Sequence, residues 1–430
     1  MLWHRPVRWN TRWNNRKAAT ERLPDQPFNS QHSATPHSPT PITQILLVRH
    51  GRSTFNEQGR FQGCSDQSVL TNAGKQAAHV VGALLSRVSI DAIYASPLQR
   101  VQQTLDAILE ERSAETPIET IRFDDRLREV DLPAWEGLPF QQVREQFAAE
   151  YHCWKQRPHE FQMVDRDTAS PFFPVCELYD RAQRFWQDRL PQHRGQTILI
   201  VGHGGSNHAL ISTALGLSPA QHHTLQQSNN GLSVLAIGDR LSSAELHGLN
   251  WTQSLGETLP KLKEGKHGLR LLLLPADRLF STHIQPLLPF LAHIAIDFSL
   301  SAYEDSQDVV DRILLNHPNT VKLQVSRSDV PYVWQQSILQ QQVELNHLLT
   351  GLVIAPNDMV KVLIAQAMGL KHTRSSALCL KSGTLSVLHY PSINHPPILQ
   401  AFNIDPKDCS RIPNSRSAKL THPQSLIPTL

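Results

Sequence analysis

The sequence is poor in cysteine, and none of its cysteines is paired with another at close spacing. Its 430 residues contain five, with no CxxC arrangement. A zinc ribbon or a disulfide framework needs paired spacings, so unpaired thiols in a reducing compartment are expected instead. The 22 histidines form no HExxH motif, and the adjacent His222 and His223 are interpreted as surface or core residues.

Long apolar runs are also missing. The longest stretches, such as residues 287–296, are interrupted by proline or histidine. They fall short of the about 20 apolar residues that a membrane-spanning helix needs. We therefore expect no membrane partner.

The chain carries little net charge, and the excess lies at one end. The formal net charge is +3, while residues 1–41 hold six basic and two acidic side chains, a net of +4. A nucleic-acid-binding protein carries its basic excess on the folded part, so no nucleic-acid partner is expected. Residues 1–41 lack apolar periodicity and are predicted to be a disordered extension. An organelle transit peptide and an overlong reading frame are the alternatives.

From Thr43 onward, short apolar runs alternate with stretches of helical periodicity. The runs predict buried strands at residues 45–48, 92–95 and 197–201. The periodic stretches predict helices at residues 72–85, 99–109, 178–190 and 204–215. Strands that alternate with helices are typical of an α/β fold with a mainly parallel sheet.

The second half of the sequence repeats short pieces of the first half. Residues 214–217 (ALGL) and 232–235 (LSVL) recur at one offset of 153, as AMGL and LSVL. Two earlier pairs of segments follow in the same chain order, residues 45–48 with 271–274 and residues 91–96 with 294–299. We therefore predict a duplicated domain, with copies at residues 42–256 and 268–405 and a polar tail at residues 406–430.

Polar residues follow the predicted strands at the ends where open α/β sheets bind their ligands. Arg49 and His50 follow the first strand, and Arg100 comes shortly after the second. His203 follows the strand at 197–201, and Gly204 opens the next helix, whose free N–H groups and dipole attract anions. Two histidines, two arginines and a glycine-rich helix start predict a pocket for a phosphoryl group.

These residues lie in five motifs that resemble those of the histidine phosphatase superfamily, also called the phosphoglycerate mutase-like family. In chain order the motifs are LVRHGRSTFNEQGRFQG, LTNAGKQA, YASPLQRVQQT, LREVDLPAWEGL and VGHGG. The resemblance covers residues 45–249, about half of the chain. It implies a three-layer α/β/α sandwich, which would be duplicated here with a degenerate second copy.

The resemblance implies a role for each residue of this group. His50 matches the nucleophile that becomes phosphohistidine, so its other ring nitrogen should donate to a backbone carbonyl and keep the ring neutral. Arg49 and Arg100 match the arginines that hold phosphate oxygens, and His203 matches a second histidine that bonds the transferred group. Glu129 matches the general acid that protonates the leaving oxygen and then activates water.

Further contacts follow from the same resemblance. Asn56 matches a polar contact to the phosphate, and the Gly204 N–H lies beside that group. Ser53 and Gln62 lie where the family touches substrate. Because arginines supply the positive charge, we expect no metal and no cofactor other than the covalent intermediate at His50.

Two features of the sequence leave open which residue acts as the general acid. Asp131 and Glu136 are acidic neighbours of Glu129 and rival candidates for its role. Pro133 and Ala134 also replace the glycine that commonly precedes the tryptophan of this motif.

The second half lacks the reactive groups at the corresponding positions. Pro275, Ala276 and Asp277 stand for residues 49–51. The counterparts of the remaining site residues are Ala355, Pro356 and Asn357 for residues 202–204, Tyr303 for Arg100 and Arg327 for Glu129. We therefore predict a catalytically silent copy, which is also a candidate surface for forming a homo-oligomer.

The predicted activity is hydrolysis of a small phosphorylated metabolite by a metal-independent phosphatase of the histidine acid type. Mutases of the family carry an ERRYYG-like string where this chain has residues 129–137, and they carry Glu where it has Arg52. The duplicated architecture resembles the 2-carboxy-D-arabinitol-1-phosphatase-like proteins of photosynthetic organisms, which implies a sugar-acid phosphate such as 2-carboxy-D-arabinitol 1-phosphate. A phosphoglycerate mutase and an α-ribazole-phosphate phosphatase remain alternatives.

A protein that binds a phosphorylated ligand without turnover, as a sensor or scaffold, is the alternative outside the enzymes. A sensor needs no nucleophile, so the presence of His50, Glu129 and His203 favours an enzyme. The expected location is the cytoplasm, or the chloroplast stroma if residues 1–41 form a transit peptide.

Overall fold

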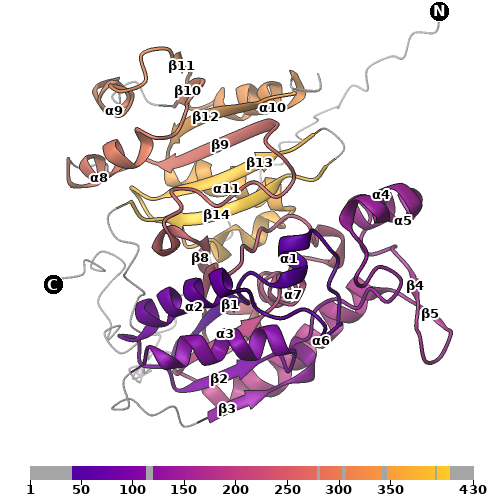
Figure 1. Ribbon diagram of the computed structural model, residues 1–430. Helices are drawn as coiled ribbons and strands as arrows, with labels where there is room; N and C mark the ends of the chain where they lie inside the picture. The colour runs from indigo at the N-terminus through magenta and orange to yellow at the C-terminus, as the bar shows by residue number, and fades with distance from the viewer. Residues whose placement is uncertain are drawn as a thin grey trace, which may run out of the picture. The chain divides into compact units, whose positions relative to one another are not determined.

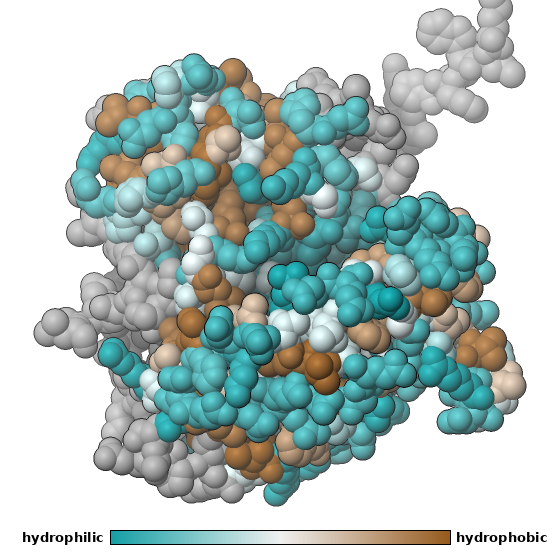
Figure 2. Space-filling model, viewed as in Figure 1, coloured by the Kyte–Doolittle hydropathy of each residue, from teal (hydrophilic) through white to brown (hydrophobic). Residues whose placement is uncertain are grey.

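The computed structural model describes residues 41–112, 120–277, 281–302, 307–340, 346–392 and 395–406. Nearly all of the predicted N-terminal extension and C-terminal tail lies outside these residues, and so does Tyr303. No helix in the described ranges combines the length and apolar composition needed to cross a membrane. On the face shown in Figure 2, hydrophilic residues cover most of the described surface and apolar ones are scattered in small groups.

The described strands form one sheet of twelve and a separate two-stranded sheet (Figure 1). In the first half, the strands of the large sheet are β1 (Thr43–Arg49), β2 (Ala92–Ala95), β3 (Thr120–Phe123), β6 (Thr197–Gly202), β7 (Leu232–Ile237) and β8 (Glu245–Trp251). In the second half they are β9 (Gly268–Pro275), β10 (Phe298–Ser301), β11 (Val321–Gln324), β12 (Leu348–Ala355), β13 (Leu385–Tyr390) and β14 (Ile398–Ile404). The small sheet pairs β4 (Met163–Val164) with β5 (Pro171–Phe172).

Helices connect the strands in both halves. The first half contains α1 (Thr54–Gln58), α2 (Asn72–Leu85), α3 (Gln99–Glu110), α4 (Phe140–Gln146), α5 (Ala148–Gln156), α6 (Pro174–Arg189) and α7 (Gly204–Leu215). The second half contains α8 (Ser281–Leu291), α9 (Gln307–Ile313), α10 (Val330–Gln340) and α11 (Asn357–Met368). The sequence-based prediction of an α/β fold with a mostly parallel sheet is confirmed.

Alternate residues of β1 bury against opposite faces of the sheet, because side chains alternate along a strand. Leu46 and Val48 join an apolar cluster with residues of α2 and α3. Ile45 and Leu47 join a cluster with residues of α6 and α7, which continues into the second half through α11. The first half therefore has helices on both faces of its sheet, in three layers (Figure 1).

The strand order is the same in both halves when each is followed outward from their junction. From β8 the order is β7, β1, β6, β2 and β3, and from β14 it is β13, β9, β12, β10 and β11. In each half, the strands from β1 or β9 outward pair in parallel. The strands between β1 and β9, which are β7, β8, β14 and β13, pair antiparallel with their neighbours. The duplication stays a prediction from the sequence, and the shared strand order supports it.

The pairing of β1 with β6 brings two distant motifs together. These strands are parallel, and Arg49 lies opposite Gly202 in the register. The residues that follow them, His50 and His203, consequently leave the sheet side by side at its carboxyl edge.

Candidate active site

His50 is held in one tautomer by the backbone. Its Nδ1 lies 2.8 Å from the carbonyl oxygen of Gly51, and the side chain is buried. A carbonyl oxygen can only accept, so Nδ1 carries the proton and Nε2 keeps its lone pair. Burial and then the charges of Arg49 and Arg100 lower the pKa of His50 well below its usual value. The neutral, nucleophilic form of the ring is therefore favoured.

His203 begins α7 beside His50. The two rings meet edge to face, with centroids 5.2 Å apart. The His203 Nε2 lies 2.7 Å from the Ser96 hydroxyl, and its backbone N–H donates to Ser206 Oγ. Burial, followed by the charge of Arg100, lowers the pKa of His203 well below the usual value. Both histidines are thus kept neutral.

The two predicted arginines lie at the same edge of the sheet. Arg100, on α3, is fully buried and donates to the carbonyl oxygens of Ser65 and Gly63 at 2.7 and 2.9 Å. Burial lowers the pKa of Arg100 to about 10, so the side chain remains charged at neutral pH. Arg49 donates to the carbonyl oxygen of Gln227 at 2.8 Å. Each guanidinium is fixed by backbone, which leaves other donors free for a ligand.

Three buried nitrogens at this site have no hydrogen-bond partner among the described residues. They are Arg49 Nε, Arg100 Nε and His203 Nδ1. Buried polar groups are normally paired, so unpartnered donors at one place suit an anion that accepts from several directions. A phosphoryl oxygen would accept from each guanidinium, and from His203 when Nδ1 carries its proton.

Glu129 lies at the amino-terminal end of α7. Its Oε2 accepts from the backbone N–H of Gly205 at 3.1 Å, and its Oε1 accepts from that of Val130 at 2.9 Å. Gly205 must lack a side chain here, because a Cβ would lie 2.3 Å from Glu129 Oε1. The carboxylate also acts electrostatically on Arg49 and Arg100. The acid therefore shares the pocket with both arginines.

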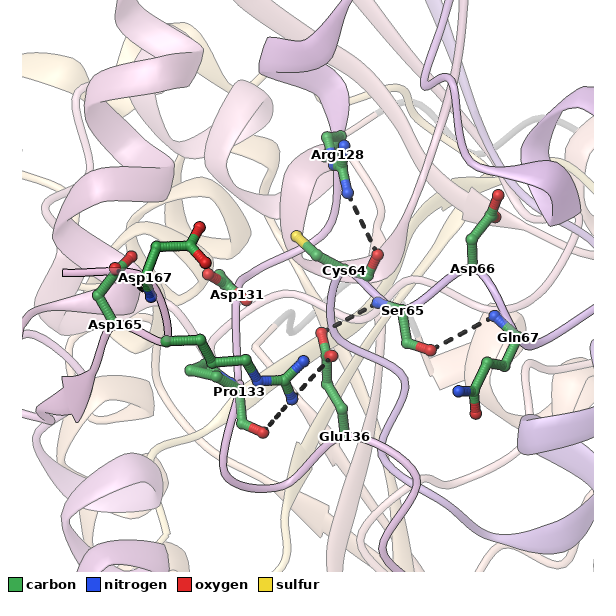
Figure 3. A pocket seen from close by; sticks show the side chains of 11 residues that line it. Cys64, Ser65, Asp66, Gln67, Arg128, Asp131, Pro133, Glu136, Asp165 and Asp167 are labelled. Carbon is green, nitrogen blue, oxygen red and sulfur yellow. Dashed lines mark hydrogen bonds and ion pairs between the residues drawn. The ribbon is translucent and has the colours of Figure 1, made fainter. Parts of the chain in front are cut away.

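The two rival acids make other contacts. Asp131 and Glu136 line a cavity of about 510 Å³ beside the segment that carries Cys64 and Ser65 (Figure 3). Glu136 accepts from the Ser65 N–H at 3.0 Å and pairs with Arg166 at 3.2 Å. Among the three acids, Glu129 is the one whose carboxylate bonds the start of α7.

Ser53, Asn56 and Gln62 form a local network around α1. Ser53 is fully buried and caps the amino-terminal end of α1, where its hydroxyl accepts from the Asn56 N–H. The same hydroxyl donates to Gln62 Oε1 at 2.8 Å, and its oxygen lies 3.0 Å from Asn56 Oδ1. The structure thus gives Ser53 a capping role, and its predicted contact with substrate, like that of Gln62 and Asn56, stays a prediction.

The structure adds residues that the sequence motifs did not single out. Asn229 donates its amide to the carbonyl oxygens of His50 and Gly51 and to Asn56 Oδ1. Thr104 accepts from the Gly51 N–H at 3.0 Å. These contacts fix the turn that orients His50. No sequence signal indicated Asn229, whereas Thr104 lies four residues after Arg100, within a recognised motif.

The second half has a different arrangement at the matching edge of its sheet. Pro275 and Ala355 are paired in the register, as Arg49 and Gly202 are in the first half. The carboxylate of Asp277 accepts from the Asn357 N–H at 2.9 Å, at the start of α11. A carboxylate of the chain itself therefore stands at this helix start, where it repels other anions.

One group of side chains could bind a metal ion, away from the histidine pair. Among the described residues, the possible ligand atoms of Glu245, His247 and Cys379 lie within 4.8 Å of one another. Burial acts to lower the pKa of His247, but hydrogen bonds with Cys379 and Glu245 raise it to about 9. The three groups thus already stabilise one another's charges. The four described cysteines are all free thiols.

Comparison with known proteins matches residues 45–251 to the histidine phosphatase superfamily, branch 1. A 2-carboxy-D-arabinitol-1-phosphatase of Triticum aestivum is 38% identical over 215 residues, which cover 49% of this chain and 41% of that protein. The match therefore spans about two fifths of that relative's length. Phosphoserine phosphatase 1 of Hydrogenobacter thermophilus is 29% identical, with 50% of this chain and 96% of that protein covered.

Two further similarities extend over most of the matched protein. A 2,3-bisphosphoglycerate-dependent phosphoglycerate mutase of Azorhizobium caulinodans is 34% identical over 183 residues, which cover 41% of this chain and 82% of that protein. Among solved structures, Bacillus stearothermophilus YhfR aligns with 26% identity and a TM-score of 0.42, covering 48% of this chain and 95% of that one. By the matched residues 45–251 and the similarity to the Azorhizobium caulinodans mutase, the chain belongs to the histidine phosphatase superfamily.

Proposed function

We propose that the protein is a phosphomonoesterase that works through a phosphohistidine at His50. The observation that carries this proposal is the hydrogen bond from His50 Nδ1 to the Gly51 carbonyl oxygen. It leaves Nε2 as the nucleophilic nitrogen, beside His203 and two arginines with unpartnered donors. A binding protein that merely holds phosphate has no need for this tautomer.

The reaction would run in two displacements. His50 Nε2 attacks the phosphorus, the bond from phosphorus to the ester oxygen breaks, and protonated Glu129 gives its proton to the leaving oxygen. Water then loses a proton to the Glu129 carboxylate and attacks the phosphohistidine. The nitrogen–phosphorus bond breaks, which releases inorganic phosphate and restores His50 and protonated Glu129.

The positive charge for both steps would come from the protein. Arg49 and Arg100 carry two charges, and His203 adds a hydrogen bond to the transferred group. We therefore propose turnover without a metal ion. The prediction is that a chelator leaves the rate unchanged.

Hydrolysis is favoured over mutase chemistry by two features of the sequence. Arg52 stands where mutases of the family carry Glu, and it is an exposed side chain paired with Glu57 at 3.5 Å. Residues 135–137 form the string WEG in place of the ERRYYG-like string. Both phosphatases among the relatives are named for substrates that carry a carboxylate, so we propose a small phosphorylated acid as substrate.

The proposal is tested by turnover of p-nitrophenyl phosphate without added metal. The His50→Ala variant should lose at least about 1000-fold in kcat, because the nucleophile is removed. Asp277→Ala is the matched control, since it alters the corresponding edge of the second half. Turnover that survives His50→Ala, or absence of turnover by the unaltered protein from pH 4 to 8, would overturn the proposal.

A further inference from the structure

A lysine from outside the matched family domain reaches the candidate active site. Lys263 lies in the segment between β8 and β9, beyond residue 251 where the family match ends. Its Nζ donates to the carbonyl oxygen of Gln227, the same oxygen that accepts from Arg49 Nη1. The ammonium and the guanidinium therefore lie within two hydrogen-bond lengths of each other.

The position of Lys263 differs from that of the two arginines. Arg100 is fully buried and Arg49 partly so, whereas Lys263 is an exposed residue. Its ammonium end nevertheless lies among protein groups, where desolvation and then the charge of Arg49 lower the pKa of Lys263 well below its usual value. An anion beside the ammonium would offset both effects. Lys263 thus lies at the outer side of the pocket with the electrostatic setting of an anion-binding group.

The charge of Lys263 is not needed to neutralise a bound phosphate group. Arg49 and Arg100 match the two negative charges of a phosphate monoester. In its protonated form Lys263 adds a third cation around a single carboxylate, that of Glu129, which in turn acts to raise the pKa of Lys263. A second anionic group on the substrate would use this charge.

Both halves of the protein hold the segment that carries Lys263. Glu264 pairs with Lys155 of α5 at 2.6 Å and lies 3.7 Å from His395 of the second half. Gln400, on β14, donates its amide to the carbonyl oxygen of Pro260. Contacts from the second half thus fix the chain on both sides of Lys263.

We propose that Lys263 binds a carboxylate of the substrate, and that the second half contributes to substrate recognition by holding this lysine at the active site. The proposal rests on the proposed function, because it assigns the substrate class of the same pocket. It gives a role to a half that carries no reactive groups of its own at the matching positions.

The test compares two ligands that differ in one group. D-3-Phosphoglycerate carries a carboxylate where sn-glycerol 1-phosphate, which has the same configuration at its central carbon, carries a hydroxymethyl group. Their dissociation constants are measured by calorimetry on the His50→Ala protein, in which neither ligand can be turned over. Lys263→Met should lower the preference for D-3-phosphoglycerate about 10- to 100-fold, the effect of one charged hydrogen bond. Lys263→Arg should restore most of it.

Lys261→Met is the matched control, because Lys261 lies two residues away with 88% of its side chain exposed. It should leave the preference unchanged. If Lys263→Met changes the dissociation constants of both ligands by the same factor, or changes neither, the proposal is overturned. Since binding is measured without turnover, failure of the phosphatase proposal would appear separately, as absence of p-nitrophenyl phosphate hydrolysis by the unaltered protein.

The contribution of the second half is tested by Gln400→Leu, which removes the hydrogen bond from β14 to the Pro260 carbonyl oxygen. The preference for D-3-phosphoglycerate should fall in the same direction as with Lys263→Met, and by less. A thermal melt followed by circular dichroism shows that the variant is folded. A folded variant with unchanged preference would overturn this part of the proposal.

Discussion

Asn250 on β8 and Asn403 on β14 make the same contact in opposite directions across the junction of the two halves. The Asn250 amide donates to the carbonyl oxygen of Gln400 at 2.8 Å, and the Asn403 amide donates to that of His247 at 3.0 Å. Both asparagines adopt the left-handed conformation, with φ of 55° and 56°. Their separation equals the offset of the sequence repeat, so the halves meet as two similar subunits do around a two-fold axis.

Because of these contacts, replacing either asparagine should lower the free energy of unfolding. Asn403→Ala should lower the free energy of unfolding by about 2–4 kcal/mol, from the lost hydrogen bonds and the strain of a positive φ. Asn403→Gly removes the same hydrogen bonds but tolerates the backbone conformation, so it should cost less. Urea unfolding of both variants measures the difference, and equal costs would show that backbone strain plays no part.

A second prediction tests whether Glu129 or one of its acidic neighbours is the general acid. Glu129→Gln should lower kcat about 100-fold or more, the usual contribution of a general acid. The loss in phosphoryl transfer should be larger for an alkyl phosphate than for p-nitrophenyl phosphate, whose leaving group needs little protonation. Asp131→Asn, in the cavity of Figure 3, is the control and should change kcat less than about threefold. The opposite ranking of these two variants would move the acid to Asp131.

Gly205 and Gly204 offer a matched pair at the start of α7. A Cβ at Gly205 would lie 2.3 Å from Glu129 Oε1, so Gly205→Ala must displace the carboxylate. We expect kcat to fall about tenfold or more, since small misplacements of reacting groups are costly. A Cβ at Gly204 would have its nearest neighbour at 3.5 Å, an ordinary contact, so Gly204→Ala should have the smaller effect. Steady-state kinetics of both variants decide between these outcomes.

Because His222 is buried, we expect the protein to lose stability as the pH falls. Burial, then the charge of Lys155, lowers the pKa of His222 to about 4. The unfolded chain binds this proton near pH 6.5, so the contribution to stability is present above that pH and is lost as the pH falls towards 4.

His222→Leu removes this proton linkage. Between pH 7 and 5 its free energy of unfolding should fall by about 2 kcal/mol less than that of the unaltered protein. Urea unfolding at the two pH values measures the difference. An identical fall in both proteins would show that His222 does not titrate with folding.

The local elements followed from patterns of neighbouring residues. The helix predicted at residues 72–85 agrees with α2 (Asn72–Leu85), and the strand predicted at 92–95 agrees with β2 (Ala92–Ala95). The helix predicted at 178–190 begins four residues earlier, at Pro174, because proline fits the first turn of a helix. Periodicity identifies an element well and its ends less well, since the ends depend on capping and packing.

The sequence alone determined the family and the α/β fold, and it predicted that Arg49, His50, Arg100 and His203 lie near one another, because a parallel sheet collects its ligand groups at one edge. The tertiary structure decided which acid bonds the start of α7, and that Asn229 and Thr104 hold the turn at His50. It also brought Lys263 to the oxygen of Gln227, 36 residues away in the chain. Local patterns specify elements, whereas contacts between distant residues depend on how those elements pack, and this packing has no signature in any single stretch of sequence.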